Sequence, residues 1–199
     1  MGTFLHVGCG ANRKEQTTAA FAGPDWRELR LDIDARVGPD IVGAMTDMAA
    51  VPDASVEAIF SAHNLEHLYP HEVPRALAEF LRVLKPDGFA VITCPDLQAA
   101  AALIAEDKLT DVAYVSPAGP IAPLDMLFGH RPPMALGNLY MAHHCGFTRR
   151  ALADTLAVGG FASVASVRRP AYFDLWAVAS KAFRTEDELR VLAAAHFPA

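Results

Sequence analysis

The sequence predicts one α/β domain with a seven-stranded, mainly parallel sheet, an antiparallel last strand and helices on both faces. Three observations support this prediction. The chain has 199 residues, which suits a single α/β core. Short apolar runs alternate with helical stretches through the first half, as βαβ units require. Two further apolar runs, residues 161–168 and 172–180, are close enough to form a hairpin.

Apolar runs and their boundaries place each element. Residues 3–7 form a short apolar run that ends at Gly8-Cys9-Gly10, which is typical of a buried parallel strand followed by a tight turn. Further strands are expected at residues 28–33, 40–43, 56–61 and 89–94. Helices are expected at residues 74–84, 97–105, 148–158 and 185–196. Thr148 and Thr185 are suitable N-caps for the last two.

Residues 110–147 lack the periodicity of a helix or a strand. Prolines, glycines and histidines accumulate there together with aromatic residues. Long irregular segments in compact domains are usually functional or disordered, and the apolar content favours an ordered one. We therefore expect a single domain over residues 1–199, in which 110–147 is an inserted substrate lid. Exposed apolar lid residues could also be buried in a homodimer.

Composition excludes several classes of function. The net charge is −6 and no basic run is longer than two residues, so we expect no nucleic-acid partner. No apolar run approaches the roughly 18 residues of a membrane span, and the first residues lack the basic region of a secretory signal. Three widely spaced cysteines do not form a disulfide framework. We expect a cytoplasmic protein with a small-molecule partner.

Two glycines and an aspartate suggest a nucleoside site. Gly8 and Gly10 allow the backbone to approach a ligand closely, and Asp32 ends the next strand, where a carboxylate can accept ribose hydroxyls. This pair fits either NAD or S-adenosylmethionine. The third glycine of a dinucleotide fingerprint is absent, because Asn12 and Arg13 follow Gly10. This disfavours NAD.

The order of several motifs resembles the class I, Rossmann-like methyltransferases that use S-adenosylmethionine, and most closely the methyltransferase 11 type. Segments similar to that family's motifs follow one another in its order: residues 7–10, 31–34, 46–48, 61–68, 80–89 and 159–161. The chain departs from the family before residue 3, because the helices that usually precede the first strand and cover the substrate are missing. The segment 110–147 is then the candidate cover.

The resemblance implies S-adenosyl-L-methionine as the cofactor and a set of residues that bind it. Glycines of the first motif would face the methionine moiety, Asp32 the ribose, Asp47 and Met48 the adenine, and His63 with Asn64 the sulfonium. The full cofactor set is Gly8, Cys9, Gly10, Asp32, Ile33, Asp47, Met48, His63 and Asn64. For Asp47, an exposed loop aspartate is the alternative.

Histidines supply the candidates for chemistry. Methyl transfer needs an aligned acceptor atom and, where that atom carries a proton, a base. His143 and His144 are the candidate bases; a purely structural role for them is the alternative. The candidate substrate contacts are His67, His130, Arg131 and Tyr140. His130 and Arg131 could bind an anionic acceptor, or could instead pair with carboxylates of the lid.

The spacing of three histidines suggests a metal site, but the residues around them argue against it. His63, His67 and His71 are four residues apart, which on a helix would align three imidazoles. Pro70 interrupts such a helix, and the family's fourth motif accounts for His67, so we expect no metal. Cys145 lacks the signature of a nucleophile.

Two functions remain. The first is methyl transfer from S-adenosylmethionine to an O, N or C atom of a small molecule. The alternative is a catalytically silent, nucleoside-binding regulatory protein of the same fold.

Overall fold

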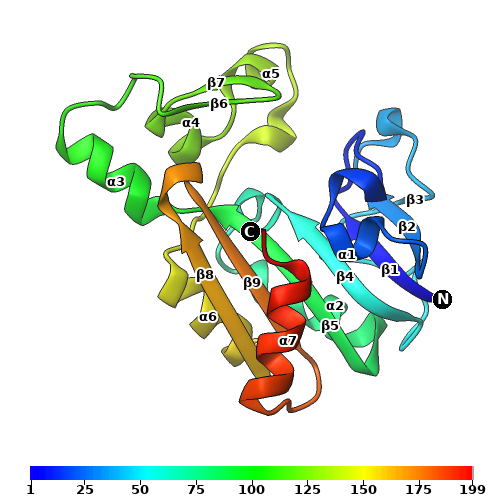
Figure 1. Cartoon of the computed structure of the whole chain (residues 1–199). Helices are drawn as coiled ribbons and strands as arrows, with labels where there is room; N and C mark the ends of the chain where they lie inside the picture. Colours follow the sequence, from blue (N-terminus) through cyan, green and yellow to red (C-terminus); the bar gives the residue numbers. More distant parts are fainter. Residues whose placement is uncertain (199) are drawn as a thin grey trace.

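The computed structural model describes residues 1–198 and contains a seven-stranded sheet with the order β3-β2-β1-β4-β5-β9-β8 (Figure 1). The strands are β1 (Gly2–Val7), β2 (Trp26–Asp32), β3 (Ile41–Val42), β4 (Val56–Ala62), β5 (Leu84–Pro95), β8 (Ser163–Arg169) and β9 (Asp174–Ser180). Strands β1 to β5 pair in parallel, and β9 lies antiparallel between β5 and β8. The predicted fold class, with its C-terminal hairpin, is confirmed.

Helices cover both faces because strand residues alternate between two apolar clusters. On one face, α2 (Val73–Val83) and α6 (Arg149–Val158) pack their apolar residues against the sheet. On the other, α1 (Ala19–Ala22) and α7 (Glu186–His196) pack around Phe21. In Figure 1, α7 lies in front of β8 and β9.

The predicted elements are found with small shifts at their ends. Thr148 and Thr185 cap α6 and α7 as expected, each accepting a backbone N–H with its side chain. Strand β5 is longer than predicted because it begins at Leu84, directly after α2. Among residues 1–198, five short 3-10 helices lie in the connections: Lys14–Gln16, Ala35–Val37, Leu65–His67, Leu139–Met141 and Pro170–Tyr172.

The segment 110–147 contains more regular structure than its sequence predicts. It forms the hairpin β6 (Tyr114–Ser116) and β7 (Gly119–Ile121), followed by α4 (Pro123–Phe128) and α5 (Arg131–Ala135). These elements are too short to show periodicity, and prolines begin or lie in the first turn of both helices. Helix α4 packs against α3 (Leu97–Ala105), and the group lies above the end of β9 (Figure 1). Within residues 1–198, no helix has the length and apolar character of a membrane span.

Candidate active site

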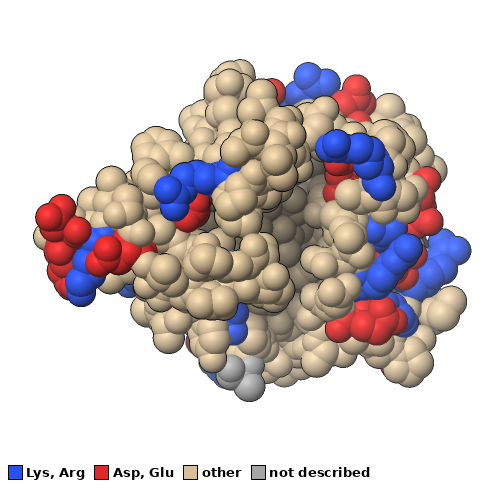
Figure 2. All heavy atoms as spheres, turned by 90° about the horizontal axis from the view of Figure 1, so that it is seen from above, with Lys and Arg blue, Asp and Glu red and all other residues tan. Residues whose placement is uncertain are grey.

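A cavity of about 380 Å³ opens at the carboxyl ends of β1, β2 and β4. The sheet order reverses between β1 and β4, which is where open α/β sheets bind their ligands. Seen from above, the molecule has a central hollow bordered mainly by uncharged residues (Figure 2). Most of the residues that line the cavity come from three strand ends and from the segment 138–144.

The glycine turn after β1 is shaped by a close contact with the turn after β4. Gly8 has φ +61°, and a Cβ at this position would lie 2.0 Å from Oδ1 of Asn64. The Asn64 amide in turn donates to the carbonyl of Val7 at 2.8 Å. His63, with φ +55°, turns the chain so that Asn64 points back toward β1. The two turns therefore hold each other at the floor of the cavity.

Asp32 lies at the end of β2 with its carboxylate beside this turn. One oxygen accepts the backbone N–H of Gly10 at 2.7 Å, and the other accepts that of Asp34 at 2.8 Å. A carboxylate oxygen can accept more than one hydrogen bond, so both oxygens can still bind ribose hydroxyls. Asp32 lines the cavity although only 8% of its surface is exposed.

Arg30 holds the same turn through hydrogen bonds to backbone carbonyls. The sequence did not lead us to expect this role. Its guanidinium is buried and donates to the carbonyls of Gly10, Asn12 and Gly38. A charged residue within a predicted buried strand was the available signal, because such a residue must find several partners. Arg30 fixes the glycine turn and the loop after β2 relative to each other.

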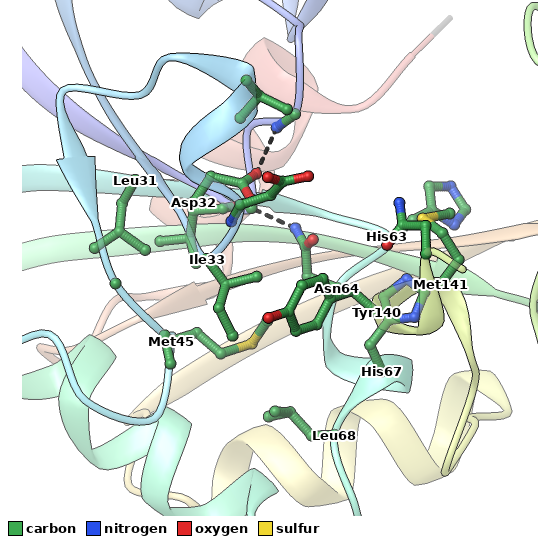
Figure 3. Close-up of a pocket in the computed structure, with 18 of the residues that line it drawn as sticks. Leu31, Asp32, Ile33, Met45, His63, Asn64, His67, Leu68, Tyr140 and Met141 are labelled. Atoms are coloured by element: carbon green, nitrogen blue, oxygen red, sulfur yellow. Dashed lines mark hydrogen bonds between the residues drawn. The ribbon is translucent and has the colours of Figure 1, made fainter. Parts of the chain in front are cut away.

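An apolar wall closes the end of the cavity beyond Asp32. Ile33, Met45 and Leu68 line it (Figure 3). Met48 instead belongs to the core, and Asp47 is exposed and does not line the cavity. In place of the expected residues 47–48, residues 43–45 line the cavity, because the chain turns away after an Ala44–Asp47 bridge.

Cys9 also lies outside the cavity, although both of its glycine neighbours line it. Its side chain is 1% exposed, and burial raises the pKa of the thiol to about 11. Cys9 therefore contributes backbone rather than a side chain to the turn. Of the expected cofactor residues, those that line the cavity are Gly8, Gly10, Asp32, Ile33, His63 and Asn64.

Three histidines line the other end of the cavity, and Tyr140 reaches between the two ends. His63, His67 and His144 line that end. The Tyr140 ring points from the lid toward Met45 (Figure 3). The exposed His144 ring stacks on Tyr69 with 4.1 Å between ring centroids. In Figure 3 the 3-10 helix that carries Tyr140 lies across the cavity from the strand ends.

A buried carboxylate lies behind these histidines. Glu66 is 1% exposed, and its Oε1 is 3.4 Å from Nδ1 of His63. Burial by itself would raise the pKa of Glu66, but the nearby His63 imidazole outweighs it and lowers the pKa. His143 does not line the cavity, and burial lowers the pKa of its ring. Glu66 is therefore ionised, and His143 is neutral, near pH 7.

His130 and Arg131 are not brought to the cavity. The Arg131 guanidinium pairs with the buried Asp125, with 2.6 Å between Nε and Oδ1. Pairing with a lid carboxylate, the alternative considered from sequence, describes this geometry.

Cys145 donates from Sγ to the carbonyl of Leu65, and burial raises its pKa to about 11, which does not suit a nucleophile.

Comparisons with known proteins agree with this fold. Residues 5–92, from β1 into β5, match the sequence model of the methyltransferase domain family. Solved structures with the same fold include a 1,6-didemethyltoxoflavin N1-methyltransferase from Burkholderia thailandensis, bound to 1,6-didemethyltoxoflavin and S-adenosylhomocysteine. It shares 18% identity with a TM-score of 0.56, over 90% of this chain and 71% of that one. No curated protein matches the sequence significantly.

Two further solved structures are similar. One is a possible histamine N-methyltransferase from Thermotoga maritima, with 14% identity and a TM-score of 0.57 over 92% of this chain and 83% of that one. Another is a methyltransferase from Methanosarcina mazei, with 17% identity and a TM-score of 0.58. The match covers 92% of this chain and 93% of that one. At these identities the likeness concerns the fold. The family match covers residues 5–92, and the solved structures share the Rossmann-like fold. Together they support a class I S-adenosylmethionine-dependent methyltransferase.

Proposed function

We propose that this methyltransferase binds S-adenosylmethionine in the cavity and transfers its methyl group to an O, N or C atom of a small molecule. One observation carries the proposal: a glycine turn, the Asp32 carboxylate and three histidines line a single cavity at the switch point of the sheet. A nucleoside and a second reactant can therefore meet within it. The alternative of a silent regulatory protein has no structural feature in its favour.

The cofactor would lie along the strand ends. Asp32 would accept the ribose hydroxyls, and the adenine would lie against Ile33 and Met45. The methionine moiety would pass over Gly8 and Gly10, which both line the cavity, and no other group lies within 4 Å of the Cβ position of Gly10. This placement directs the sulfonium toward His63 and His67.

The acceptor would then enter between the histidines and Tyr140. Methyl transfer is an in-line displacement, so the site mainly has to align the acceptor atom with the sulfonium carbon. His144 is the better placed of the two candidate bases, because its exposed ring reaches the cavity and that of His143 does not. His144 would accept the proton of an O–H or N–H acceptor.

The size of the cavity favours a small acceptor. About 380 Å³ is near the lower limit of ligand pockets, so the cofactor would leave little space. The segment 110–147 would act as the lid that admits the acceptor. Nitrogen heterocycles and amines are the first acceptors to test, because two proteins of similar fold are described as N-methyltransferases.

Location and assembly are part of the same proposal. Cys9, Cys94 and Cys145 are free thiols, which suits the cytoplasm, and we propose that location. Several apolar lid residues are exposed, among them Leu136 and Leu139, and a homodimer would cover them.

Calorimetric titration with S-adenosylhomocysteine tests the cofactor site. We expect Asp32→Ala to weaken binding about 100-fold or more, as expected when charge-assisted hydrogen bonds to two hydroxyls are lost. Asp47→Ala is the matched control, because this exposed aspartate lies outside the cavity, and its affinity should equal that of the unmodified protein. Absence of binding to the unmodified protein would refute the proposal. Release of S-adenosylhomocysteine with a panel of amines, phenols and heterocycles then identifies the acceptor.

A further inference from the structure

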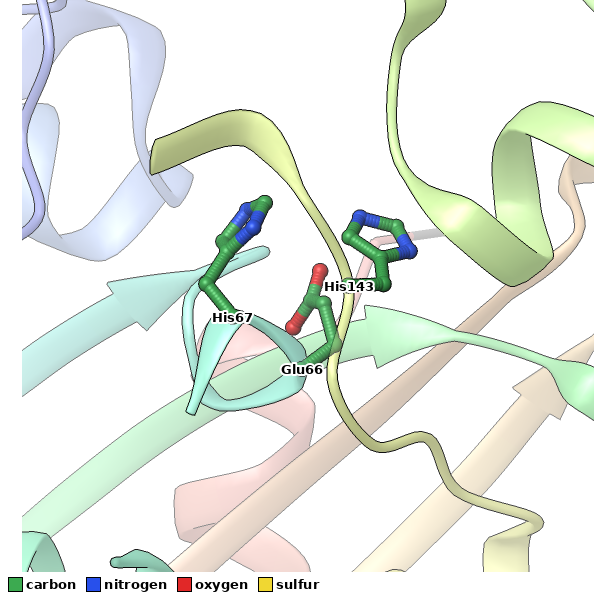
Figure 4. Close-up of side chains that lie close together, drawn as sticks. All are labelled: Glu66, His67 and His143. Carbon is green, nitrogen blue, oxygen red and sulfur yellow. The ribbon is translucent and has the colours of Figure 1, made fainter. Parts of the chain in front are cut away.

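A glutamate and two histidines meet behind the acceptor end of the cavity. Glu66 and His67 belong to the turn after β4, and His143 comes from the chain that leaves the lid. Ligand atoms of the three side chains all lie within 4.8 Å of one another. Figure 4 shows the Glu66 carboxylate between the two imidazole rings. Residues distant in sequence thus converge on one point.

The Glu66 carboxylate is buried without the partners that such a group requires. Among residues 1–198, neither of its oxygens has a hydrogen-bond partner, and the side chain is 1% exposed. The nearest cationic group, Nδ1 of His63, is 3.4 Å from Oε1, outside the usual range of a charge-assisted hydrogen bond. Apart from this long ion pair with His63, nothing offsets the burial of the carboxylate, and a cation held nearer to its oxygens would do so.

Both imidazoles are oriented as metal-ligating histidines are. Nδ1 of His67 lies 3.0 Å from the carbonyl oxygen of Ala142, and Nδ1 of His143 lies 2.9 Å from that of Met126. A carbonyl can only accept, so each Nδ1 carries a proton, and in the neutral tautomer the lone pair then lies on Nε2. Donation of one ring N–H to a carbonyl is the outer-sphere arrangement that fixes the tautomer of a ligating histidine.

We propose that Glu66, His67 and His143 bind one divalent transition-metal ion at the acceptor end of the cavity. Two imidazoles and a carboxylate suit zinc and neighbouring metals, and three protein ligands leave at least one coordination position open. His67 also lines the cavity, so the open position faces the space assigned to the acceptor. The sequence led us to expect no metal, and of the histidines considered there, His63, His67 and His71, only His67 belongs to this cluster.

The metal would select acceptors with an oxygen or nitrogen that can coordinate it. This role rests on the proposed methyl transfer, whereas the metal site itself does not. A coordinated O–H or N–H group loses its proton more readily. Its lone pair would then form the bond to the methyl carbon while the carbon–sulfur bond breaks. The proton would pass to His144 or to water, and the sulfonium would become a neutral thioether.

Metal titration of the chelator-treated protein tests the site without any acceptor. We expect one equivalent of Zn²⁺ to bind in calorimetry, and Co²⁺ to give visible absorption bands of a site with nitrogen ligands. Glu66→Gln keeps the shape of the side chain but removes its charge, and His143→Ala removes one imidazole. Each should weaken Zn²⁺ binding by more than the roughly 10- to 100-fold that loss of an outer-sphere partner costs.

His71→Ala is the matched control, because His71 lies outside the cluster and is exposed. It should bind Zn²⁺ as the unmodified protein does. S-adenosylhomocysteine titration of every variant reports folding and separates the two proposals, since Glu66 and His143 do not line the cavity. If Glu66→Gln does not fold, His143→Ala decides. No Zn²⁺ binding to the unmodified protein, or unchanged binding in a folded Glu66→Gln or His143→Ala variant, would overturn the metal site.

Discussion

The two ends of the cavity are built from different kinds of structure. At the cofactor end, Asp32 ends a strand of the central sheet, Gly8 and Asn64 lie in the turns after two others, and hydrogen bonds between these turns fix them. On the lid side, Tyr140 lies in a 3-10 helix outside the sheet and is 56% exposed. The cofactor end is part of the folded core, whereas the lid packs on the outside of that core.

This difference predicts how substitutions act. A residue that the sheet positions contributes to folding and to ligand binding at once, so its replacement should lower both. A residue on the exposed lid has few buried contacts, so its replacement should alter binding with little effect on stability. Stability and affinity measured together therefore distinguish the two ends.

Gly8→Ala should have the largest effect. The new Cβ would lie 2.0 Å from the Asn64 side chain and would adopt an unfavourable φ of +61°. Strain and overpacking together should lower the free energy of unfolding by about 4 kcal/mol and abolish S-adenosylhomocysteine binding. Urea denaturation and calorimetry measure the two quantities.

Gly38→Ala is the matched control for Gly8→Ala. Gly38 has nearly the same φ, +60°, but a Cβ there would meet nothing within 4 Å. Its cost should be limited to the backbone term of about 1–2 kcal/mol, with cofactor binding retained. Equal destabilisation of both variants would show that the contact between the two turns does not matter, and would break the argument that the cofactor end is part of the core.

Acid should lower the free energy of unfolding through His196, which packs α7 against α1. The effect should be slightly smaller than that of Gly8→Ala. His196 of α7 is 3% exposed, packs against the Phe21 ring of α1 at a tilt of 49°, and is hydrogen-bonded through Nδ1 to Thr18. Burial lowers the pKa of His196 to about 4, from a usual value near 6.5. Between these values the unfolded chain binds a proton and the folded protein does not, so stability falls as the pH decreases.

The contribution of His196 should be about 3 kcal/mol, present above pH 6.5 and lost by about pH 4. Urea denaturation at several pH values measures it. Other groups titrate in the same range, so the decisive comparison is with His196→Gln, whose stability should fall less steeply with pH. The exposed His71→Gln should keep the slope of the unmodified protein. Parallel slopes in all three proteins would show that His196 is not a source of the acid sensitivity.

The same contrast explains how much could be predicted from the sequence. Strand ends, the glycine turn and Asp32 follow from local rules, because apolar runs and turn residues determine them within a few positions. The contact of Glu66 with His143 could not be predicted, since it depends on where a segment without periodicity returns to the sheet. Met45 lines the cavity where Met48 was expected for a related reason: no sequence pattern determines the path of a short loop.

Tyr140→Ala should have the smallest effect on stability and still alter binding. The ring lines the cavity but is more than half exposed, so the free energy of unfolding should change by less than about 0.5 kcal/mol. Loss of one aromatic contact worth roughly 1 kcal/mol should weaken S-adenosylhomocysteine binding about fivefold. Leu136→Ala, which replaces a 90% exposed residue of the same segment outside the cavity, should change neither quantity.

If Tyr140→Ala binds S-adenosylhomocysteine normally, the lid does not touch the cofactor, and the boundary between the two ends lies at the sulfonium. If Tyr140→Ala instead destabilises the protein as Gly8→Ala does, the lid is part of the core and the contrast between the two ends is lost.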